Sequence, residues 1–567
     1  MKKNSILFRA VSQNFKKIPG SPIAYWVGES VSGIFEQSIT LGQISDVKQG
    51  IIPGNVERFV RVWHEVSLDK IGFGHAEFAD IKRFKKKWYP YNKGGGFRRW
   101  YGNCLHLIEM ENEGYAIKYS GENNNYRLRE PTLYFKEAIT WSKIASGDFS
   151  ARYMPSGTLF DIAGCCIFGL EEHGFIPLSF LNSNVATYLL GAISPTLNYE
   201  VEHIKRLPAG RVSSDKKDRC YSISEELVKL SRADWDEYET SWDFKVNPLV
   251  REGWQRSGAA MKLEAAWSAV FARRLEWAER MKKLEEENNR LFIEAYGLQD
   301  ELSPDVEWKD VSITGNPAYR YKLDGNPQSG EELAQADAMR ELISYGMGVL
   351  MGRYSLEQEG LILASQGETY KDYIERVHGA GKILPDDDGI IPAIALDGSI
   401  FQDNILHRMR EFLSAAFGND ALPGNLNFIE EALGCGFDKY LTDKFFDDHA
   451  KTYRKRPIYW LFESPKGYFR AFAYMHRMTG ATAGLIRNKY LLSYIEHLER
   501  TFAAESAKGA AMNGAERRRV KEIEKAIADC KAYDLVLHDI AEKSIAIDLD
   551  DGVVVNWAKY KSVLAKI

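Results

Sequence analysis

The sequence has few cysteines, and they are not spaced as metal ligands. Six cysteines occur in 567 residues, and none stands in a C-x-x-C pair or at the Cys/His intervals that zinc sites use. The single adjacent pair, Cys165 and Cys166, lies in an apolar run, where buried thiols are common. A structural zinc site is therefore not expected, and the compartment is expected to be reducing.

Long apolar runs are also missing. No segment approaches the roughly 18 uncharged apolar residues that a membrane-spanning helix needs. The N-terminal stretch carries charges but no apolar core of signal-peptide length. We therefore expect a cytoplasmic protein with no membrane partner.

Motifs that would make a self-sufficient active site are absent too. The sequence contains no HExxH and no G-x-S-x-G elbow. Gly346, Gly348 and Gly352 lack the Lys-Ser/Thr of a phosphate-binding loop and stand in a helical pattern, so helix packing explains them better. Asp386–Asp388 could hold a hard cation, but short acidic turns are usually solvated, and we predict no metal.

One tetrad invites a catalytic interpretation. Asn316-Pro317-Ala318-Tyr319 matches the N-P-x-Y element with which amino-methyltransferases hold an adenine amine. That chemistry needs the tetrad at the end of a core strand and a glycine-rich cofactor element upstream. Here the tetrad lies in a turn-rich linker, so we predict neither a catalytic nor a cofactor-binding residue in this chain.

Acidic residues are absent between Asp80 and Glu109, and the functional interpretation of the sequence depends mainly on this stretch. Its positive residues are Lys82, Arg83, Lys85, Lys86, Lys87, Lys93, Arg98 and Arg99. They alternate with aromatic residues and with Gly94–Gly96, where the backbone can approach a ligand closely. This pattern is typical of a polyanion contact, although a solvated basic loop with an aromatic anchor would look the same. Because the whole chain has a net charge of −5, any such binding must be local.

Composition and hydrophobic period divide the chain into four segments and predict an α+β multidomain fold. Residues 1–40 resemble a connector from a missing N-terminal part. Strand and turn signals make 41–210 a β-rich module, in which YAIKYS is expected to be extended and a helix is expected from about Ser183 to Ile193. Residues 211–325 form a helical spacer, with a helical period over 222–300 and an apolar stripe through Trp267. Residues 326–567 form a mainly helical C-terminal domain, and its last stretch, IDLDDGVVVNWAKYKSVLAKI, is expected to be a strand or tail.

A second cluster of basic and aromatic residues precedes an apolar run in the last segment. It contains Arg454, Lys455 and Arg456, followed by Pro457, which stiffens the turn. Two separated basic patches would suit a clamp on duplex DNA. They would equally suit an interface with an acidic partner.

Several stretches of the sequence resemble a known protein family. The stretches KKWYPYNKGGGFRRWYGN, ISDVKQGIIPGNVERFVRVWHEV, ELISYGMGVLMGRYSLEQEGLILA, KTYRKRPIYWLFESPKG and DLDDGVVVNWAKY resemble the C-terminal half of PglX-type adenine-specific DNA methyltransferases of BREX phage-defence systems. The first two also look like the TaqI-like specificity domain of type IIG restriction-modification enzymes. The resemblance covers almost the whole chain.

The resemblance implies a division of labour. In that family an N-terminal half carries the S-adenosylmethionine pocket and the N-P-P-Y tetrad, so this chain would need a catalytic half in cis or in trans and would hold no cofactor itself. It would bind double-stranded DNA and present the target adenine, as a base must leave the stack before it is methylated. The alternative is a scaffold or regulatory protein that binds another BREX protein through the same patches.

The predicted DNA contacts follow from side-chain chemistry. Guanidinium groups can bond the O6 and N7 of guanine together, which favours Arg98 and Arg99 as base readers, while lysines favour phosphates. The full predicted set is Lys85, Lys86, Lys87, Trp88, Tyr91, Lys93, Gly94, Gly95, Arg98, Arg99, Trp100, Arg454, Lys455 and Arg456.

Overall fold

The computed structural model describes residues 29–75, 77–121, 125–145, 147–170, 174–194, 196–209, 211–255, 261–378 and 381–567. These residues form two compact units, each built from three separate segments. Of the described residues, the first unit contains 29–62 and those within Lys70–Asp236 and Ala272–Glu331; the second contains those within Trp63–Asp69, Glu237–Phe271 and Glu332–Ile567. Both units combine helices and sheets, which confirms the predicted α+β fold class. The four-segment division remains a prediction.

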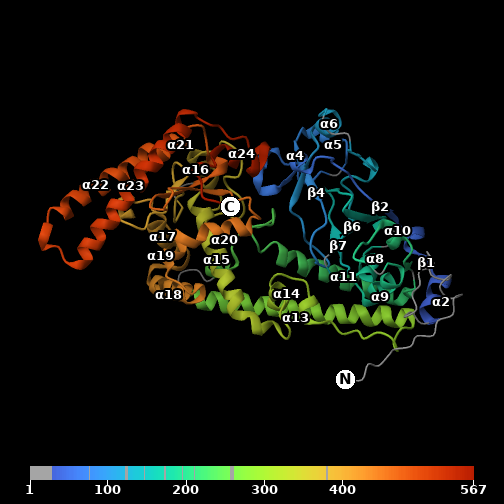
Figure 1. The fold of residues 1–567 in the computed structure, drawn as a ribbon. Coiled ribbons are helices and arrows are strands. Elements are labelled where there is room, and N and C mark those ends of the chain that lie inside the picture. Colours follow the sequence, from blue (N-terminus) through green and yellow to red (C-terminus); the bar gives the residue numbers. More distant parts are fainter. Residues whose placement is uncertain are drawn as a thin grey trace, which may run out of the picture. The chain divides into compact units, whose positions relative to one another are not determined.

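Two four-stranded sheets make the centre of the first unit (Figure 1). The first has the order β2-β9-β6-β7, with every neighbouring pair antiparallel. The second has the order β3-β5-β4-β8, in which β4 and β8 are parallel. The strands are β2 (Asp46–Lys48), β3 (Val60–Val62), β4 (Trp88–Asn92), β5 (His106–Glu109), β6 (Ala138–Ser142), β7 (Ala151–Met154), β8 (Leu159–Phe160) and β9 (Gly164–Phe168).

The sheet that contains β9 is buried on both faces, because alternate residues of the strand enter different cores. Cys165 and Ile167 belong to the core formed with the helices, whereas Cys166 and Phe168 belong to the core shared with the second sheet. The helices on the first side are α8 (Ile176–Leu181), α9 (Asn184–Ile193), α10 (Val201–Lys205), α11 (Ser214–Trp235) and the C-terminal part of α13 (Leu263–Tyr296). The adjacent cysteines therefore point to opposite faces, and burial raises the pKa of both thiols.

The second unit is mainly helical and carries one three-stranded antiparallel sheet in the order β11-β13-β12. Its strands are β11 (Ile390–Pro392), β12 (Tyr459–Glu463) and β13 (Arg470–Tyr474). Its longer helices are α15 (Glu331–Leu350), α17 (Ile405–Phe417), α18 (Leu422–Leu433), α20 (Phe445–Thr452), α22 (Leu492–Ser506) and α23 (Gly514–Glu542). In α15, a Cβ on Gly348 would lie 2.4 Å from the Tyr354 ring, which confirms that this glycine serves close packing.

Short elements complete both units. In the first, β1 (Ile39–Thr40) pairs with β10 (Pro208–Ala209), and the small helices are α2 (Glu29–Gln37), α3 (Leu41–Ile44), α4 (Val56–Phe59), α5 (Asp80–Phe84), α6 (Glu111–Tyr119) and α14 (Pro317–Tyr321). In the second they are α12 (Pro248–Gln255), α16 (Tyr370–Val377), α19 (Phe437–Lys439), α21 (Thr482–Leu485) and α24 (Gly552–Tyr560). Within the described ranges, every helix is too short or too polar to span a lipid bilayer.

Two local predictions from the sequence are wrong. The segment around YAIKYS was expected to be extended, but most of it lies in α6, whose first turn contains three left-handed residues, Asn112–Gly114, that kink the helix. The segment GVVVNWAKY was expected to be a strand or tail, but it forms α24. Its buried positions include Val553, Trp557 and Tyr560, at helical spacing, so packing overrides the strand preference of three consecutive valines. The helical prediction for 222–300 is confirmed by α11, α12 and α13.

Candidate nucleic-acid interface

The predicted phosphate contacts lie where α5 ends. Lys85 closes the helix in a left-handed conformation (φ 49°), with its N–H donating to the carbonyl of Ile81. Its side chain is exposed, and those of Lys86 and Lys87 are half-buried. The ammonium of Lys87 lies 5.6 Å from the centre of the Trp88 ring. We call Lys85–Lys87 the lysine run; it carries three positive charges on the short connection from α5 to β4.

The aromatic residues that alternate with these charges are mostly core residues. Trp88 and Tyr91 of β4 are buried, as is Trp100 further along. The hydroxyl of Tyr91 donates a hydrogen bond to the carboxylate of Asp161. Of the two roles that the sequence left open for the aromatic residues, the structure shows the anchoring one for these three.

Residues 93–103 form a loop, which we call the glycine loop, and its first two glycines are required by backbone conformation and packing inside the protein. Gly94 and Gly95 have φ values of 78° and 150°. The N–H of Gly95 donates to Oγ of Ser142 over 2.9 Å, and that hydroxyl donates back to the Gly95 carbonyl over 2.8 Å. A Cβ on Gly95 would lie 2.6 Å from the side chain of Asn103. The loop is thus a folded part of the unit, with Lys93 half-buried at its start.

Arg98 is buried among partners from distant segments. Its Nη2 lies 2.7 Å from the carboxylate of Asp234 in α11, and its Nη1 donates to Oγ1 of Thr314 over 2.9 Å. The guanidinium also lies 5.0 Å from the centre of the Trp235 ring. The carboxylate of Asp234 accepts two further bonds, from the N–H groups of Thr314 (2.7 Å) and Gly315 (2.6 Å). Asp234 therefore ties the glycine loop to residues 314–315.

Arg99 and Trp100 are held by α13. The carboxylate of Glu285 accepts from Nη1 of Arg99 over 3.0 Å and from Nε1 of Trp100 over 2.6 Å. The backbone N–H of Arg99 donates to Oγ of Ser312 over 2.8 Å. Burial raises the pKa of Glu285, while the Arg99 charge and these bonds oppose that shift. We call Asp234 and Glu285 the brace acids.

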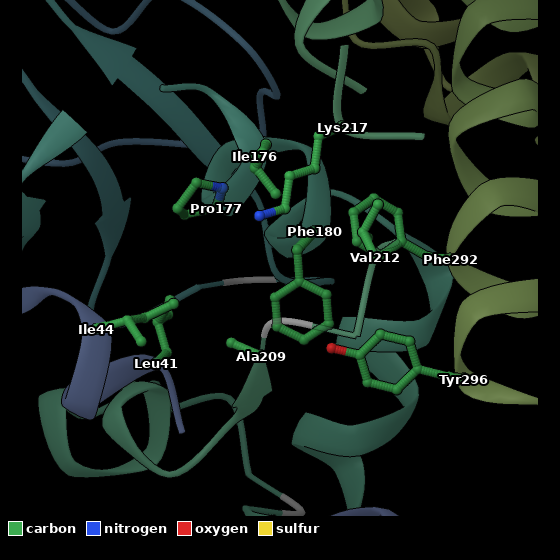
Figure 2. Close-up of a pocket in the computed structure, with 10 residues that line it drawn as sticks. All are labelled: Leu41, Ile44, Ile176, Pro177, Phe180, Ala209, Val212, Lys217, Phe292 and Tyr296. Atoms are coloured by element: carbon green, nitrogen blue, oxygen red, sulfur yellow. The ribbon is translucent and has the colours of Figure 1, made fainter. Parts of the chain in front are cut away.

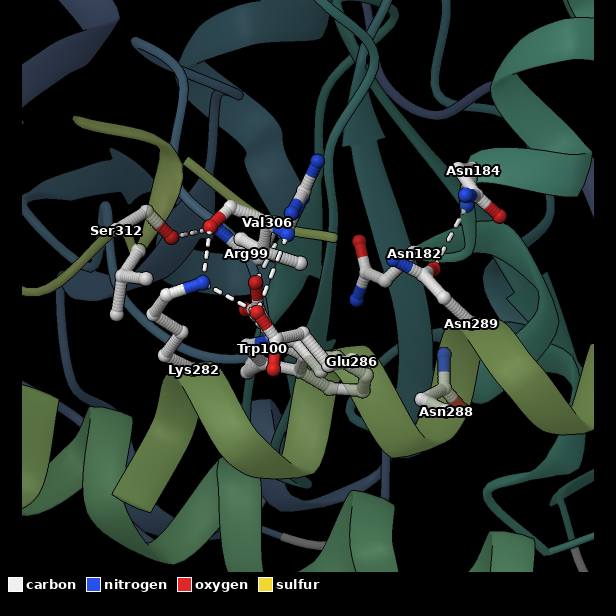
Figure 3. Close-up of polar contacts among 12 residues, drawn as sticks. Arg99, Trp100, Asn182, Asn184, Lys282, Glu286, Asn288, Asn289, Val306 and Ser312 are labelled. Atoms are coloured by element: carbon white, nitrogen blue, oxygen red, sulfur yellow. Dashed lines mark hydrogen bonds and ion pairs between the residues drawn. The ribbon is translucent and has the colours of Figure 1, made fainter. Parts of the chain in front are cut away.

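The same side of α13 fixes other loops of the first unit (Figure 3). Nδ2 of Asn288 donates to the carbonyl of Ser179 over 2.9 Å. Asn289 accepts from the N–H of Asn184 and donates to the carbonyl of Pro304, both over 3.0 Å. Lys282 donates to the carbonyl of Val306. The polar side chains of this half of α13 therefore hold several loops of the first unit, and Glu285 among them holds the glycine loop.

In this arrangement the predicted base readers serve internal partners. The guanidinium groups of Arg98 and Arg99 are both ion-paired inside the unit, and any contact with a base would have to replace those pairs. Among the predicted basic residues of this unit, Lys85 is exposed and Lys86, Lys87 and Lys93 are half-buried, so the lysines rather than the arginines are the groups that reach solvent. The brace acids were missed from the sequence. The available signal was a carboxylate on the buried face of a helix, as Asp234 follows Ile223, Leu227 and Ser231 at helical spacing.

The second basic cluster lies at the end of α20 in the second unit. Arg454 and Lys455 are exposed and both left-handed, with φ values of 54° and 61°. Nε of Arg456 lies 2.8 Å from the buried carboxylate of Glu65. The structure therefore presents Arg454 and Lys455 to solvent and uses Arg456 as an internal partner.

The N-P-A-Y tetrad has a structural role. Asn316 is the N-cap of α14: its Oδ1 accepts from the N–H of Ala318 over 3.1 Å, and its amide donates to the carbonyls of Trp308 and Val311. The hydroxyl of Tyr319 donates to the carbonyl of Phe97 in the glycine loop. The side-chain polar groups of Asn316 and Tyr319 are therefore all hydrogen-bonded within the first unit.

The acidic turn in the second unit is neutralised by its surroundings. Oδ1 of Asp386 accepts three backbone N–H bonds, from residues 388, 389 and 390. The ammonium of Lys489 lies 2.6 Å from the carboxylate of Asp388. Carboxylate oxygens of Asp386, Asp387 and Asp388 do lie within 4.8 Å of one another, but this lysine supplies the positive charge there.

An apolar cavity in the first unit is too small for a nucleotide-like cofactor. It has a volume of about 70 Å³ and is lined mainly by aliphatic and aromatic side chains, among them Phe180 and Phe292 (Figure 2). Ligand pockets for drug-sized molecules measure about 300 to 1,000 Å³. The Tyr296 hydroxyl at its wall already donates to the carbonyl of Pro208 over 2.8 Å. We assign no ligand to this cavity.

Comparison with known proteins gives matches along the whole chain. It is 36% identical over 578 residues to the adenine-specific methyltransferase PglX of Lacticaseibacillus casei (strain Zhang), an alignment that covers 98% of this chain and 45% of that protein. It is 33% identical over 596 residues to the adenine-specific methyltransferase BrxX of Escherichia coli O9:H4 (strain HS), covering 100% of this chain and 47% of that protein. No family model matches the chain.

The chain thus spans about half the length of these relatives. Identity above 30% across nearly 600 aligned residues is carried by both units rather than by one motif. The chain is therefore a homologue, along its whole length, of adenine-specific methyltransferases of the PglX type.

Proposed function

We propose that this chain is the DNA-recognition portion of an adenine-N6 DNA methyltransferase of a BREX phage-defence system. Its relatives are adenine-specific methyltransferases, which supports a role in methylating adenine. The observation that carries the DNA-binding part is the lysine run at the end of α5, within a stretch, 81–108, that has no acidic residue. Ammonium groups clustered in this way release counterions when they neutralise phosphates, and this drives binding to DNA.

The proposed division of labour follows from the chemistry of adenine methylation. A target base inside a duplex must leave the stack before its exocyclic amine can react. Phosphate contacts fix the protein's register on the duplex while that happens. In this proposal the chain grips the duplex, and a catalytic half, corresponding to the remaining length of the relatives, binds S-adenosylmethionine and transfers the methyl group. We place the assembly in the cytoplasm.

The test is charge reversal of the lysine run. Lys85, Lys86 and Lys87 are all changed to Glu, and binding to a set of duplexes is measured from low to moderate salt. Because each lost phosphate contact changes the slope of log K against log salt by about 0.9, three lost contacts should flatten the slope by about 2.7 for every sequence.

A matched control carries the same change of net charge elsewhere. Lys229, Lys283 and Lys371 are exposed residues of three other helices, and their joint reversal to Glu should leave the slope at the wild-type value. Equal slopes for the two triple variants would contradict the proposal. Binding of another defence-system protein, without affinity for DNA, would favour the scaffold role.

The cofactor part of the proposal has its own test. Calorimetric titration of this chain with S-adenosylmethionine should show no binding, and labelled methyl transfer to duplex DNA should appear only when the catalytic half is added. The Asn316→Ala variant is the informative control, because this asparagine caps α14. Micromolar cofactor binding that this substitution abolishes would overturn the assignment of the tetrad to structure.

A further inference from the structure

Two tyrosines of α6 expose their rings side by side. Tyr115 is 61% exposed and Tyr119 is 68% exposed, and their ring centres lie 4.8 Å apart at 43°. The left-handed residues Asn112–Gly114 precede the regular part of α6, and both tyrosines lie in that regular part. Large exposed aromatic surface on a soluble protein commonly marks a contact site.

The basic helix α5 packs beside α6 (Figure 1). The ammonium of Lys82 lies 3.1 Å from the carboxylate of Glu113, so one acid at the start of α6 is already neutralised by α5. Phe84 is 46% exposed and stacks on His75 with ring centres 4.9 Å apart. The guanidinium of Arg83 lies 5.0 Å from the centre of the Phe84 ring. Exposed rings and basic side chains therefore occur on both helices, and the basic residues continue into the lysine run.

We propose that Tyr115 and Tyr119 form a stacking surface for a base of DNA whose phosphates the lysine run holds. This inference rests on the proposed DNA-recognition function. Rings with exposed faces accept any base, because every base has a π-face, and neighbouring cations hold the backbone that presents it. An unstacked base is the species that adenine methylation requires, so the tyrosine pair offers a place for a base or base step opened near the target.

The choice of DNA over a protein partner follows from the surroundings of the rings. The exposed basic residues on and after α5 are Lys82, Arg83 and Lys85, and Lys118 lies between the two tyrosines in sequence. The exposed acids nearby are Glu111, at the start of α6, and Glu77, before α5. Because Lys82 is paired with Glu113, a phosphate backbone would be attracted mainly by the other basic residues and repelled by Glu111. Replacing Glu111 with Gln should therefore raise the affinity for DNA.

The experiment compares three forms of the full chain on duplex DNA with a central mismatch, which lowers the cost of unstacking. The variant Tyr115→Ser/Tyr119→Ser removes both rings, and Tyr115→Phe/Tyr119→Phe keeps them. Loss of stacking should weaken binding about 5- to 150-fold for each base contacted in the serine variant, and binding by the phenylalanine variant should stay near wild type. The salt slope should be unchanged in both, because the lysine run is intact.

The outcomes separate this inference from the proposed function. If the wild type binds duplex DNA and the serine variant binds equally well, the tyrosine inference is overturned and the DNA-recognition proposal stands. If the wild type binds no duplex, both fail. Equal losses in the serine and phenylalanine variants would show that the hydroxyl groups carry the contact, and the stacking role would be overturned. Since both rings are exposed, the urea midpoints of the three forms should agree, and this excludes misfolding as the cause.

Discussion

Replacing Asp234 with Asn tests whether Arg98 is a structural residue or a reader of DNA. The carboxylate of Asp234 is fully buried, and it accepts from Arg98 Nη2 (2.7 Å) and from the N–H groups of Thr314 (2.7 Å) and Gly315 (2.6 Å). The asparagine keeps the size of the side chain but leaves the guanidinium without a counter-charge, and one former acceptor becomes an NH₂ group. Removing one member of a buried ion pair costs about 3 to 5 kcal/mol.

That cost is large compared with the stability of a domain, which is about 5 to 15 kcal/mol. With a denaturant dependence of about 3 kcal/mol per M, the urea midpoint of the first unit should fall by about 1 to 2 M. Thr314 and Gly315 donate to different oxygens of Asp234, so hydrogen exchange should also become faster at the one of these two amides that faces the new NH₂ group. Mass spectrometry of peptides that cover 310–320 measures this directly.

A control on the same helix makes the result specific. Asp218 is exposed on α11, so Asp218→Asn should change the stability by no more than about 0.5 kcal/mol. Unchanged urea midpoints and exchange rates in Asp234→Asn, together with a loss of DNA affinity in Arg98→Met, would refute the structural role of the ion pair between Asp234 and Arg98. Arg98 would then be available to a base, as its residue type predicts.

Two further predictions concern the second unit. Burial raises the pKa of Glu239 from 4.5 to about 7, so its stabilising contribution is present below about pH 4.5 and is lost as the pH rises through 7. Glutamine cannot ionise, so the stability of Glu239→Gln relative to the wild type should rise by up to about 3 kcal/mol between pH 5 and pH 8.5 in urea unfolding. A stability difference that is the same at both pH values would contradict the raised pKa. Trp267, which is buried and stacked on Phe271, should act on stability: Trp267→Ala should cost about 3 to 5 kcal/mol, and unchanged thermal stability with lost DNA binding would contradict a packing role.

Local sequence signals predicted local structure well. Ser183 was placed at the start of a helix ending at Ile193, and it caps α9 by accepting from the N–H of Ala186. The charge of the 81–103 stretch was also evident from residue types alone, and so was the close packing around Gly348. These features depend on residues a few positions apart, or on the composition of one segment.

The partners of the basic stretch could not be predicted in the same way. Arg98 pairs with a carboxylate 136 residues away, and Arg99 with one 186 residues away. No pattern within the stretch distinguishes an arginine that faces DNA from one that faces a buried acid. The aromatic residues had the same ambiguity, since residue type does not tell which side of β4 a ring occupies. Tertiary packing decided each case.

The positions of the brace acids in the chain also affect when the first unit can fold during synthesis. Glu285, whose carboxylate accepts a hydrogen bond from Trp100, lies 185 residues after it. At about 5 to 20 residues per second, a ribosome needs about 10 to 40 s to cover that distance. During this interval the nascent first unit carries the glycine loop without α13, and part of its helix-side core, including Met281 and Leu284, has not yet been made. The first unit can therefore complete its folding only after the ribosome has passed residue 331, so slow translation between the two regions would lengthen the exposure of its sheets to chaperones and proteases.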